Sequence, residues 1–229
     1  MPLVHHQAMR RLMAGIKGFR IRHYEQHPDS MRLLAEQGQK PEVLLIGCSD
    51  SRVDPALLTQ AEPGELFVVR NVANLVPPFQ PDGHYHGTSA AIEYAVTVLE
   101  VSHVVVLGHA RCGGIQGLIR LNGGERPPGD FVAPWVSIAR SACDRVAAEA
   151  GGDVNTDDPR AVMEWMLESP QLLERAAVQG SLDNLMTFPF IRERIEQGRL
   201  HLHGWWFDLQ SGDLWAVDPA TSNFVPVFD

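Results

Sequence analysis

The chain has 229 residues, of which 45% are hydrophobic, and its 19 lysines and arginines against 28 acidic residues give a formal net charge of -9. This length suits one sizeable α/β domain, and the acidic balance argues against a nucleic-acid or anionic-membrane partner because there is no basic surplus to meet phosphates. The opening residues lack the apolar stretch of a signal peptide, and no run reaches the roughly 18 apolar residues of a membrane span. Three cysteines do not suggest a disulfide framework. We therefore expect a soluble protein of the cytoplasm.

Residues 1–38 predict a helical arm. Apolar Leu12, Ile16 and Phe19 recur at helical spacing among basic residues, and a second periodic stretch begins near residue 30. The apolar face of this arm has no obvious partner in the sequence. It either packs on the domain core or embraces a second subunit.

The next segments predict a mainly parallel sheet. Residues 43–47, 66–69 and 103–108 are short apolar runs rich in branched side chains, which is typical of strands buried on both faces. Residues 89–99 have helical periodicity. This alternation of strand and helix indicates an α/β fold in which helices flank the sheet.

The remainder of the chain changes character after residue 120. Helical patterns lie near 133–150, 159–178 and 181–197, with Gly151-Gly152 and Gly180 as the expected breaks. The end of the chain alternates and turns at Ser211-Gly212, which predicts a β-hairpin. We therefore expect a single domain over 1–229, made of the arm at 1–38, a metal-site core at 39–120, and helices with C-terminal strands at 121–229.

Two of the predicted strands end in residues that bind metals. Cys48 follows the first strand, and His109 and Cys112 follow the third. Because sites form at the carboxyl ends of parallel strands, these three side chains can converge on one ion, and thiolate with imidazole suits zinc. Three protein ligands leave a position open, as in catalytic zinc sites. Cys143 lies in an apolar helical pattern and is expected in the core.

Each of these patterns has a plainer interpretation. A single buried cysteine after a strand usually packs, and Asp50 with Arg52 could form an ordinary strand-end salt bridge. His201 and His203 share one face of the C-terminal strand, where a second metal is an alternative to ordinary surface histidines.

The motifs together resemble a known family. The segments CSDSR (48–52) and HARCGG (109–114) resemble the signature of the β-class carbonic anhydrases, and segments 70–74 and 87–95 are similar to that family as well. The resemblance is dense over residues 20–125 and looser beyond, and its pocket residues resemble those of the plant-type branch.

The resemblance implies a function and an assembly. It implies zinc-dependent, reversible hydration of carbon dioxide to bicarbonate and a proton by attack of zinc-bound hydroxide, in a homodimer or larger homo-oligomer such as a tetramer. Asp50 would orient the hydroxide, Arg52 would keep Asp50 ionised, and Asp50 would become a fourth ligand only in a closed form. Hydrolysis of carbonyl sulfide or carbon disulfide on the same scaffold is the alternative, and a structural zinc site would need a fourth fixed ligand.

The resemblance also implies the substrate pocket. Phe67, Val72 and Tyr94 would form its walls, Gln39 would donate a hydrogen bond across the subunit interface, and the backbone N–H of Gly113 would face a substrate oxygen.

Some bacterial members of the family hold an inhibitory bicarbonate between a tryptophan, an arginine and a tyrosine. The corresponding positions here are Leu45, Arg70 and Phe207. This departure predicts a constitutively open site in which water holds the fourth position.

Overall fold

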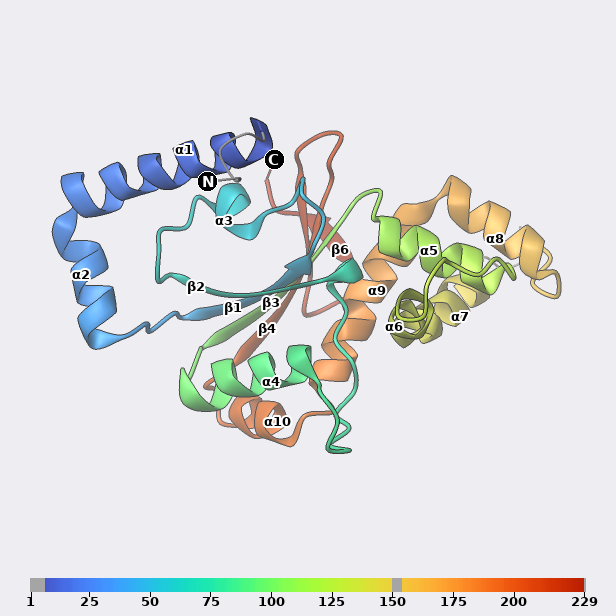
Figure 1. Ribbon diagram of the computed structural model, residues 1–229. Coiled ribbons are helices and arrows are strands. Elements are labelled where there is room, and N and C mark those ends of the chain that lie inside the picture. The colour runs from blue at the N-terminus through green and yellow to red at the C-terminus, as the bar shows by residue number, and fades with distance from the viewer. Residues whose placement is uncertain (1–6, 150–153, 229) are drawn as a thin grey trace. The chain divides into compact units, whose positions relative to one another are not determined.

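The computed structural model describes residues 7–149 and 154–228. Its internal contacts divide the chain into two compact units, Met1–Lys40 and Pro41–Asp229. Figure 1 shows the helices of the first unit in blue and the sheet with its helices in the second.

The first unit is helical over its described residues. It consists of α1 (Gln7–Arg20), a π-helical turn η2 (Ile21–Gln26) and α2 (Pro28–Gln37). Pro28 begins α2 with its φ already set, and Gly38 ends the helix at a φ of 80°. The predicted helical arm is confirmed from residue 7, and residues 1–6 of it lie outside the described part.

The second unit contains one six-stranded sheet in the order β2-β1-β3-β4-β5-β6. Its first four strands are parallel and the last two antiparallel. The prediction of a mainly parallel sheet ending in a hairpin is confirmed. The strands are β1 (Val43–Cys48), β2 (Leu66–Asn71), β3 (His103–His109), β4 (His201–Phe207), β5 (Leu214–Val217) and β6 (Phe224–Pro226).

Helices cover one face of the sheet and gather beyond the carboxyl ends of its strands (Figure 1). On the covered face, side chains such as Ile46 and Val106 pack with Ile92, Val178 and Ile191 from the helices. The covering helices are α4 (Gly87–Glu93), η4 (Tyr94–Val98), α9 (Pro170–Leu185) and α10 (Pro189–Glu196).

A second apolar cluster lies beyond the strand ends, where Leu118, Val136, Ala142, Met166 and Leu173 pack together with the metal-site cysteines. Burial of this cluster fixes the helices that follow the strands. These are α5 (Gly113–Asn122), α6 (Val132–Val136), η5 (Ser137–Ala139), α7 (Arg140–Glu149) and α8 (Pro159–Glu168), with the short α3 (Pro55–Thr59) and η3 (Val72–Asn74) in the loops after β1 and β2.

The predicted helix break at Gly180 is wrong. α9 runs through this residue without interruption, and the breaks fall before Pro170 and Pro189 instead. An interior glycine costs a helix about 1 kcal/mol, which the burial of Val178 and Leu185 on the sheet outweighs. The other predicted break, at Gly151-Gly152, lies outside the described residues.

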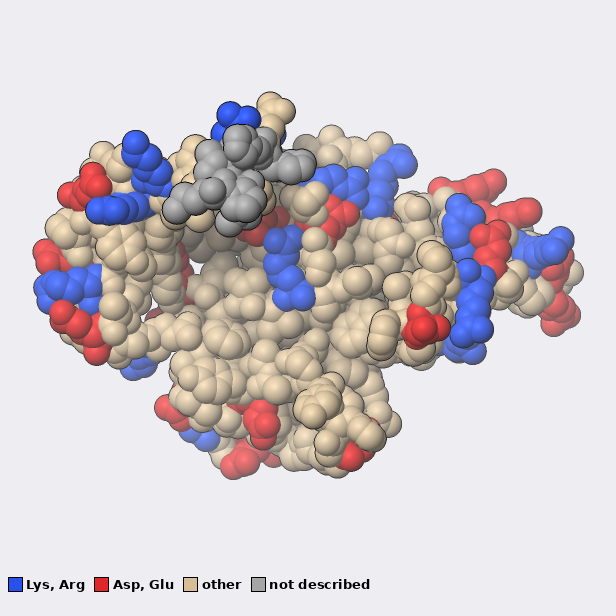
Figure 2. All heavy atoms as spheres, viewed as in Figure 1, with Lys and Arg blue, Asp and Glu red and all other residues tan. Residues whose placement is uncertain are grey.

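Charged side chains are mixed on the face drawn in Figure 2. Over α5 and α8, basic and acidic residues lie interspersed and form no broad field of one sign. Among residues 7–149 and 154–228, no helix combines the length and the apolar composition needed to cross a membrane.

Candidate metal centre

The sheet topology brings the predicted ligands to one place. β1 lies between β2 and β3, so the chain leaves β1 toward one neighbour and returns later on the other side, which opens a crevice at the carboxyl ends. Cys48 is the last residue of β1 and His109 the last of β3. After a turn in which Arg111 takes a φ of 56°, Cys112 stands directly before the first residue of α5.

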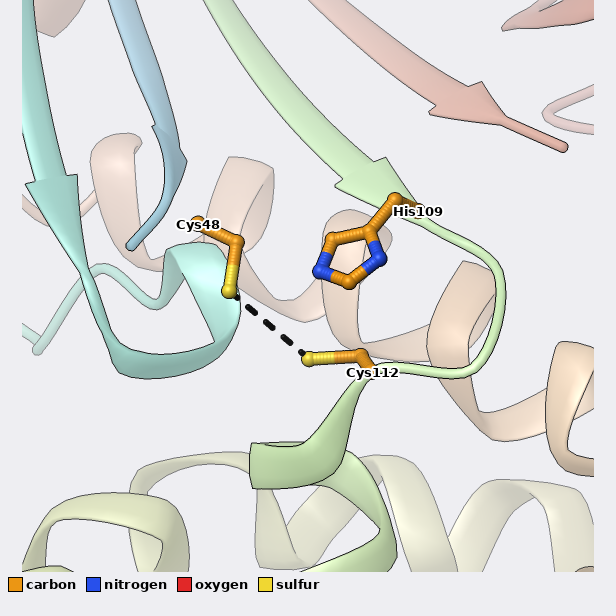
Figure 3. A group of neighbouring side chains, drawn as sticks. All are labelled: Cys48, His109 and Cys112. Carbon is orange, nitrogen blue, oxygen red and sulfur yellow. Dashed lines mark hydrogen bonds between the residues drawn. The ribbon is translucent and has the colours of Figure 1, made fainter. Parts of the chain in front are cut away.

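The three side chains meet at one buried point. The ligand atoms of Cys48, His109 and Cys112 all lie within 4.8 Å of one another, and Figure 3 shows both sulfurs and the imidazole facing the same space. The two Sγ atoms are 3.9 Å apart. Two thiolates on one tetrahedral zinc, each about 2.3 Å from the ion, would be separated by about 3.8 Å, so the spacing fits that metal.

The imidazole of His109 is oriented for coordination. Its Nδ1 atom donates a hydrogen bond to the carbonyl of Ala110 at 2.9 Å, which leaves a lone pair on Nε2. That Nε2 atom is buried and has no hydrogen-bond partner. A buried nitrogen without a partner is costly, and a metal ion would satisfy it. The donor set and this free nitrogen fit zinc.

The two thiols are in hydrogen-bonding contact with each other. This contact lowers the pKa of Cys48 below its ordinary value and raises the pKa of Cys112 above it. The contact therefore favours the thiolate form of Cys48. A divalent cation bound between them would displace the thiol proton and leave both sulfurs ionised.

Cys143 takes no part in this group. It is 2% exposed and packs among the helices beyond the strands, and burial raises its pKa to about 12. The prediction that Cys143 belongs to the core is confirmed.

Asp50 and Arg52 form a bidentate ion pair beside the ligands. Oδ1 of Asp50 accepts from Nε of Arg52 at 2.9 Å, and Oδ2 accepts from Nη2 at 2.7 Å. The guanidinium holds the pKa of Asp50 well below its ordinary value. In this arrangement the carboxylate faces Arg52 and is not a member of the metal-binding group.

Arg70 clamps the loop that carries these residues. Its Nε donates to the carbonyl of Cys48 at 2.9 Å, its Nη2 to the carbonyl of Asp50 at 2.6 Å, and its Nη1 pairs with Asp54 at 2.6 Å. The sequence associated Arg70 only with a bicarbonate pocket. Its nitrogens instead fix the backbone between the first ligand and Asp50.

Glu174 is a supporting residue that the sequence did not reveal. This α9 residue is 2% exposed; its Oε1 accepts from the backbone N–H of Cys112 at 3.1 Å, and its Oε2 accepts from Nε1 of Trp206 at 3.2 Å. Burial raises the pKa of Glu174. An acidic residue within a helical pattern normally predicts a solvated position, so no local signal could have identified it.

The start of α5 approaches the loop after β2 closely. A Cβ atom on Gly114 would lie 2.7 Å from Cγ1 of Val72 and 2.9 Å from Cβ of Ala73, whereas a Cβ on Gly113 would meet nothing within 4 Å. Gly114 therefore permits this approach. The predicted pocket residue Val72 thus lies against the start of α5, where Gly113 follows the ligand Cys112 and has open space beside its Cα.

The other predicted pocket residues lie elsewhere. Phe67 and Tyr94 are neighbours, with ring centroids 5.9 Å apart. Phe67 precedes Asn71, the β2 partner of Cys48, by four residues, or about 13 Å of strand. Gln39 belongs to the first unit. Their place in a substrate pocket stays a prediction.

A cavity of about 720 Å³ has Val72 in its lining. Asn71, His86, Phe131 and Trp135 contribute to its mainly apolar wall. None of the three metal-binding side chains lines this cavity.

Fold and site together define an open-sheet α/β protein with a group of two cysteines and a histidine at the topological switch point that is able to hold one metal ion. The carbonic anhydrase family model matches residues 43–214. The chain belongs to the β-class carbonic anhydrase family.

Individual relatives agree with this assignment. A carbonic anhydrase of Synechococcus elongatus is 38% identical and covers 94% of this chain and 74% of its own, and beta carbonic anhydrase 3 of Arabidopsis thaliana is 35% identical and covers 94% and 80%. The solved structure of the β-carbonic anhydrase CcaA superposes with a TM-score of 0.80 at 35% identity, covering 98% of this chain and 94% of its own. A tetrameric β-carbonic anhydrase of Sordaria macrospora gives 0.72 at 30% identity, covering 93% and 98%.

Proposed function

We propose that this protein catalyses the reversible hydration of carbon dioxide to bicarbonate and a proton, with zinc held by Cys48, His109 and Cys112. The observation that carries the proposal is the incomplete ligand set, three buried donors within 4.8 Å of one another, beside an ionised carboxylate that is not one of them. A structural zinc site uses four ligands and has no use for such a carboxylate.

When bound in such a site, zinc supplies a hydroxide nucleophile at neutral pH by lowering the pKa of its water. The carboxylate of Asp50 accepts a hydrogen bond from the attacking group and directs its lone pair toward the carbon of the substrate. Arg52 holds Asp50 in place through two parallel hydrogen bonds and keeps it ionised. In a closed form, Asp50 would leave Arg52 and become a fourth ligand.

The fourth position is proposed to be open to water as the resting arrangement. Support comes from the engagement of Asp50 by Arg52 and from the three hydrogen-bonding partners of Arg70. An arginine that clamps the backbone in this way is poorly placed to bind bicarbonate. A structure at low pH with Asp50 on zinc and bicarbonate beside Arg70 would contradict this arrangement.

Substrate binding is proposed to use both subunits of a homodimer. Val72 and the N–H of Gly113 would contact substrate within one chain, and Phe67, Tyr94 and Gln39 would come from the partner. Two observations support a dimer. First, the Phe67–Tyr94 pair lies about 13 Å along β2 from the strand position next to Cys48, so it is distant from the metal ligands of its own chain. Second, the apolar side chain of Ile16 on the helical arm is 69% exposed, as expected for a surface that a partner covers. A tetramer built from two such dimers is the assembly that we propose.

The alternative reaction, hydrolysis of carbonyl sulfide or carbon disulfide, receives no support from the relatives, which are named carbonic anhydrases. We also propose that the protein works in a reducing compartment such as the cytoplasm. All three cysteines are free, and two of them must remain thiolates to hold the metal.

Stopped-flow measurement of carbon dioxide hydration tests the function, with zinc content measured on every sample. The wild type should be active, Asp50→Ala should lose at least about 100-fold in kcat/KM while retaining zinc, and Asp157→Ala, an exposed acidic position, should behave as wild type. Wild-type protein that is loaded with zinc but inactive would reject the proposal, and sulfide release would then test the alternative.

A further inference from the structure

Three histidines gather at the other end of the sheet. His103 begins β3 and pairs with His201, the first residue of β4, and His203 follows two residues later on the same face. β3 and β4 are adjacent strands (Figure 1). His109 lies six positions after His103 on β3, which is about 20 Å of extended chain, so this cluster is separate from the metal centre.

Two of the imidazoles already face each other. Nδ1 of His103 lies 3.1 Å from Nε2 of His203, and the ring of His201 stacks on that of His103 with centroids 5.4 Å apart. His103 and His203 are half-buried and His201 is exposed. Burial, together with the neighbouring histidines, lowers the pKa of His203, so its lone pair is available at neutral pH.

The backbone holds this arrangement in register. The N–H groups of Ser102 and His103 both donate to the carbonyl of Glu42, at 3.0 and 3.1 Å, and the N–H of His201 donates to the carbonyl of Ser102 at 2.9 Å. The strands therefore present His103 and His203 from fixed positions, as a binding site on regular structure requires.

We propose that His103 and His203, joined by His201, form a second and exchangeable site for a divalent transition metal of the zinc, nickel and copper group. Two imidazole nitrogens bound to one tetrahedral ion at 2.0–2.1 Å would be about 3.3 Å apart, close to the 3.1 Å between Nδ1 of His103 and Nε2 of His203. Imidazole suits these metals. His201 completes the site by turning its exposed ring, and water fills the remaining position.

Nickel binding to the zinc-loaded protein tests this site. His5 and His6, which lie outside the described residues, are first replaced by glutamine to remove a competing histidine pair. Calorimetric titration with Ni²⁺ and elemental analysis after gel filtration should then find one nickel per chain with zinc fully retained. The double variant His103→Gln/His203→Gln should lose the nickel, and His27→Gln/His84→Gln, at exposed positions, should keep it.

Folding of each variant is checked by circular dichroism and by its zinc content. His201 is exposed, so His201→Gln should fold normally and weaken nickel binding by about tenfold, which keeps the test valid should the double variant unfold. The proposal is overturned if the parent protein retains no nickel, if nickel displaces zinc ion for ion, or if neither substitution changes the affinity. In those cases His103 and His203 share only a hydrogen bond.

Discussion

Oε1 of Glu174 accepts a hydrogen bond from the backbone N–H of Cys112 at 3.1 Å, deep in the protein. The other oxygen of the same carboxylate, Oε2, accepts a hydrogen bond from Nε1–H of Trp206 on β4. Glu174 therefore ties the turn that delivers the third ligand to the central sheet. Residues that orient ligands in this way commonly affect metal affinity as strongly as some ligands do.

Replacing Glu174 with glutamine should weaken metal binding. The amide keeps the volume of the side chain but has only one accepting atom, so its NH₂ group must face either the Cys112 N–H or the Trp206 Nε1–H. We expect zinc affinity to fall about 10- to 100-fold and the free energy of unfolding to fall by about 1–3 kcal/mol. Competition with a chromophoric chelator and urea titration measure the two quantities.

The matched control is Glu168→Gln, at an exposed position of α8. It makes the same chemical change away from the site and should alter neither quantity. If Glu174→Gln bound zinc as tightly as the wild type, the hydrogen bond to Cys112 would have no positioning role.

Substitution of Arg52 should move the pH dependence of catalysis. In the wild type, the guanidinium holds the pKa of Asp50 well below its ordinary value. The carboxylate is therefore ionised across the working pH range, and it becomes protonated only as the pH falls through that lowered pKa. Arg52→Gln removes the hydrogen bonds from the guanidinium and its charge. The pKa of Asp50 should then rise toward about 4, and kcat/KM should fall more steeply than in the wild type as the pH drops through that value.

The measurement is kcat/KM for carbon dioxide hydration over the acidic range, with zinc content confirmed at each pH. Arg120→Gln changes an exposed arginine of α5 that pairs with Glu125 and serves as the comparison. An unchanged acidic limb in Arg52→Gln would mean that Arg52 does not control the ionisation of Asp50.

Cysteine substitutions should distinguish the cysteines that bind the metal from the cysteine that only packs in the core. Cys143→Ala should keep one zinc per chain and lose about 1–3 kcal/mol of stability, because it leaves a small cavity among the helices. Cys112→Ala should lose the metal altogether. Elemental analysis combined with thermal unfolding distinguishes the two results, and loss of zinc from Cys143→Ala would place that residue in the site.

The ligand set was predictable because strand ends are visible in the sequence. Buried strands read as apolar runs, and Cys48 and His109 follow two of them directly, so parallel topology alone brings them together. The sequence resemblance then supplied the pairing of Asp50 with Arg52, which the structure contains as an adjacent ion pair.

Other features depend on contacts between distant segments. Glu174 lies 62 residues from Cys112, and His103 lies 100 residues from His203. No local pattern records such distances. The helix break predicted at Gly180 was wrong for the same reason. The free-energy cost of a glycine in a helix is small compared with the stabilisation that α9 gains by burying its apolar side chains on the sheet.

The close approach of α5 to the loop after β2 predicts opposite effects for two glycines of one helix. At Gly114 an added Cβ would lie 2.7 Å from Cγ1 of Val72, so Gly114→Ala must push Val72 or the start of α5 out of place. At Gly117 an added Cβ meets nothing within 4 Å. We expect Gly114→Ala to cost about 1–3 kcal/mol of stability, and Gly117→Ala to add about 0.4–1 kcal/mol by restricting the unfolded chain.

The two alanine variants should differ in catalytic activity as they do in stability, because Val72 and Gly113 lie beside the metal ligands. Gly114→Ala should lower kcat/KM for carbon dioxide hydration, and Gly117→Ala should leave it unchanged. Urea unfolding of the zinc-loaded proteins and stopped-flow assays on the same samples give both values. Equal stabilities for the two alanine variants would show that the loop after β2 yields to a methyl group, and the fit between Val72 and α5 would then not determine the shape of the site.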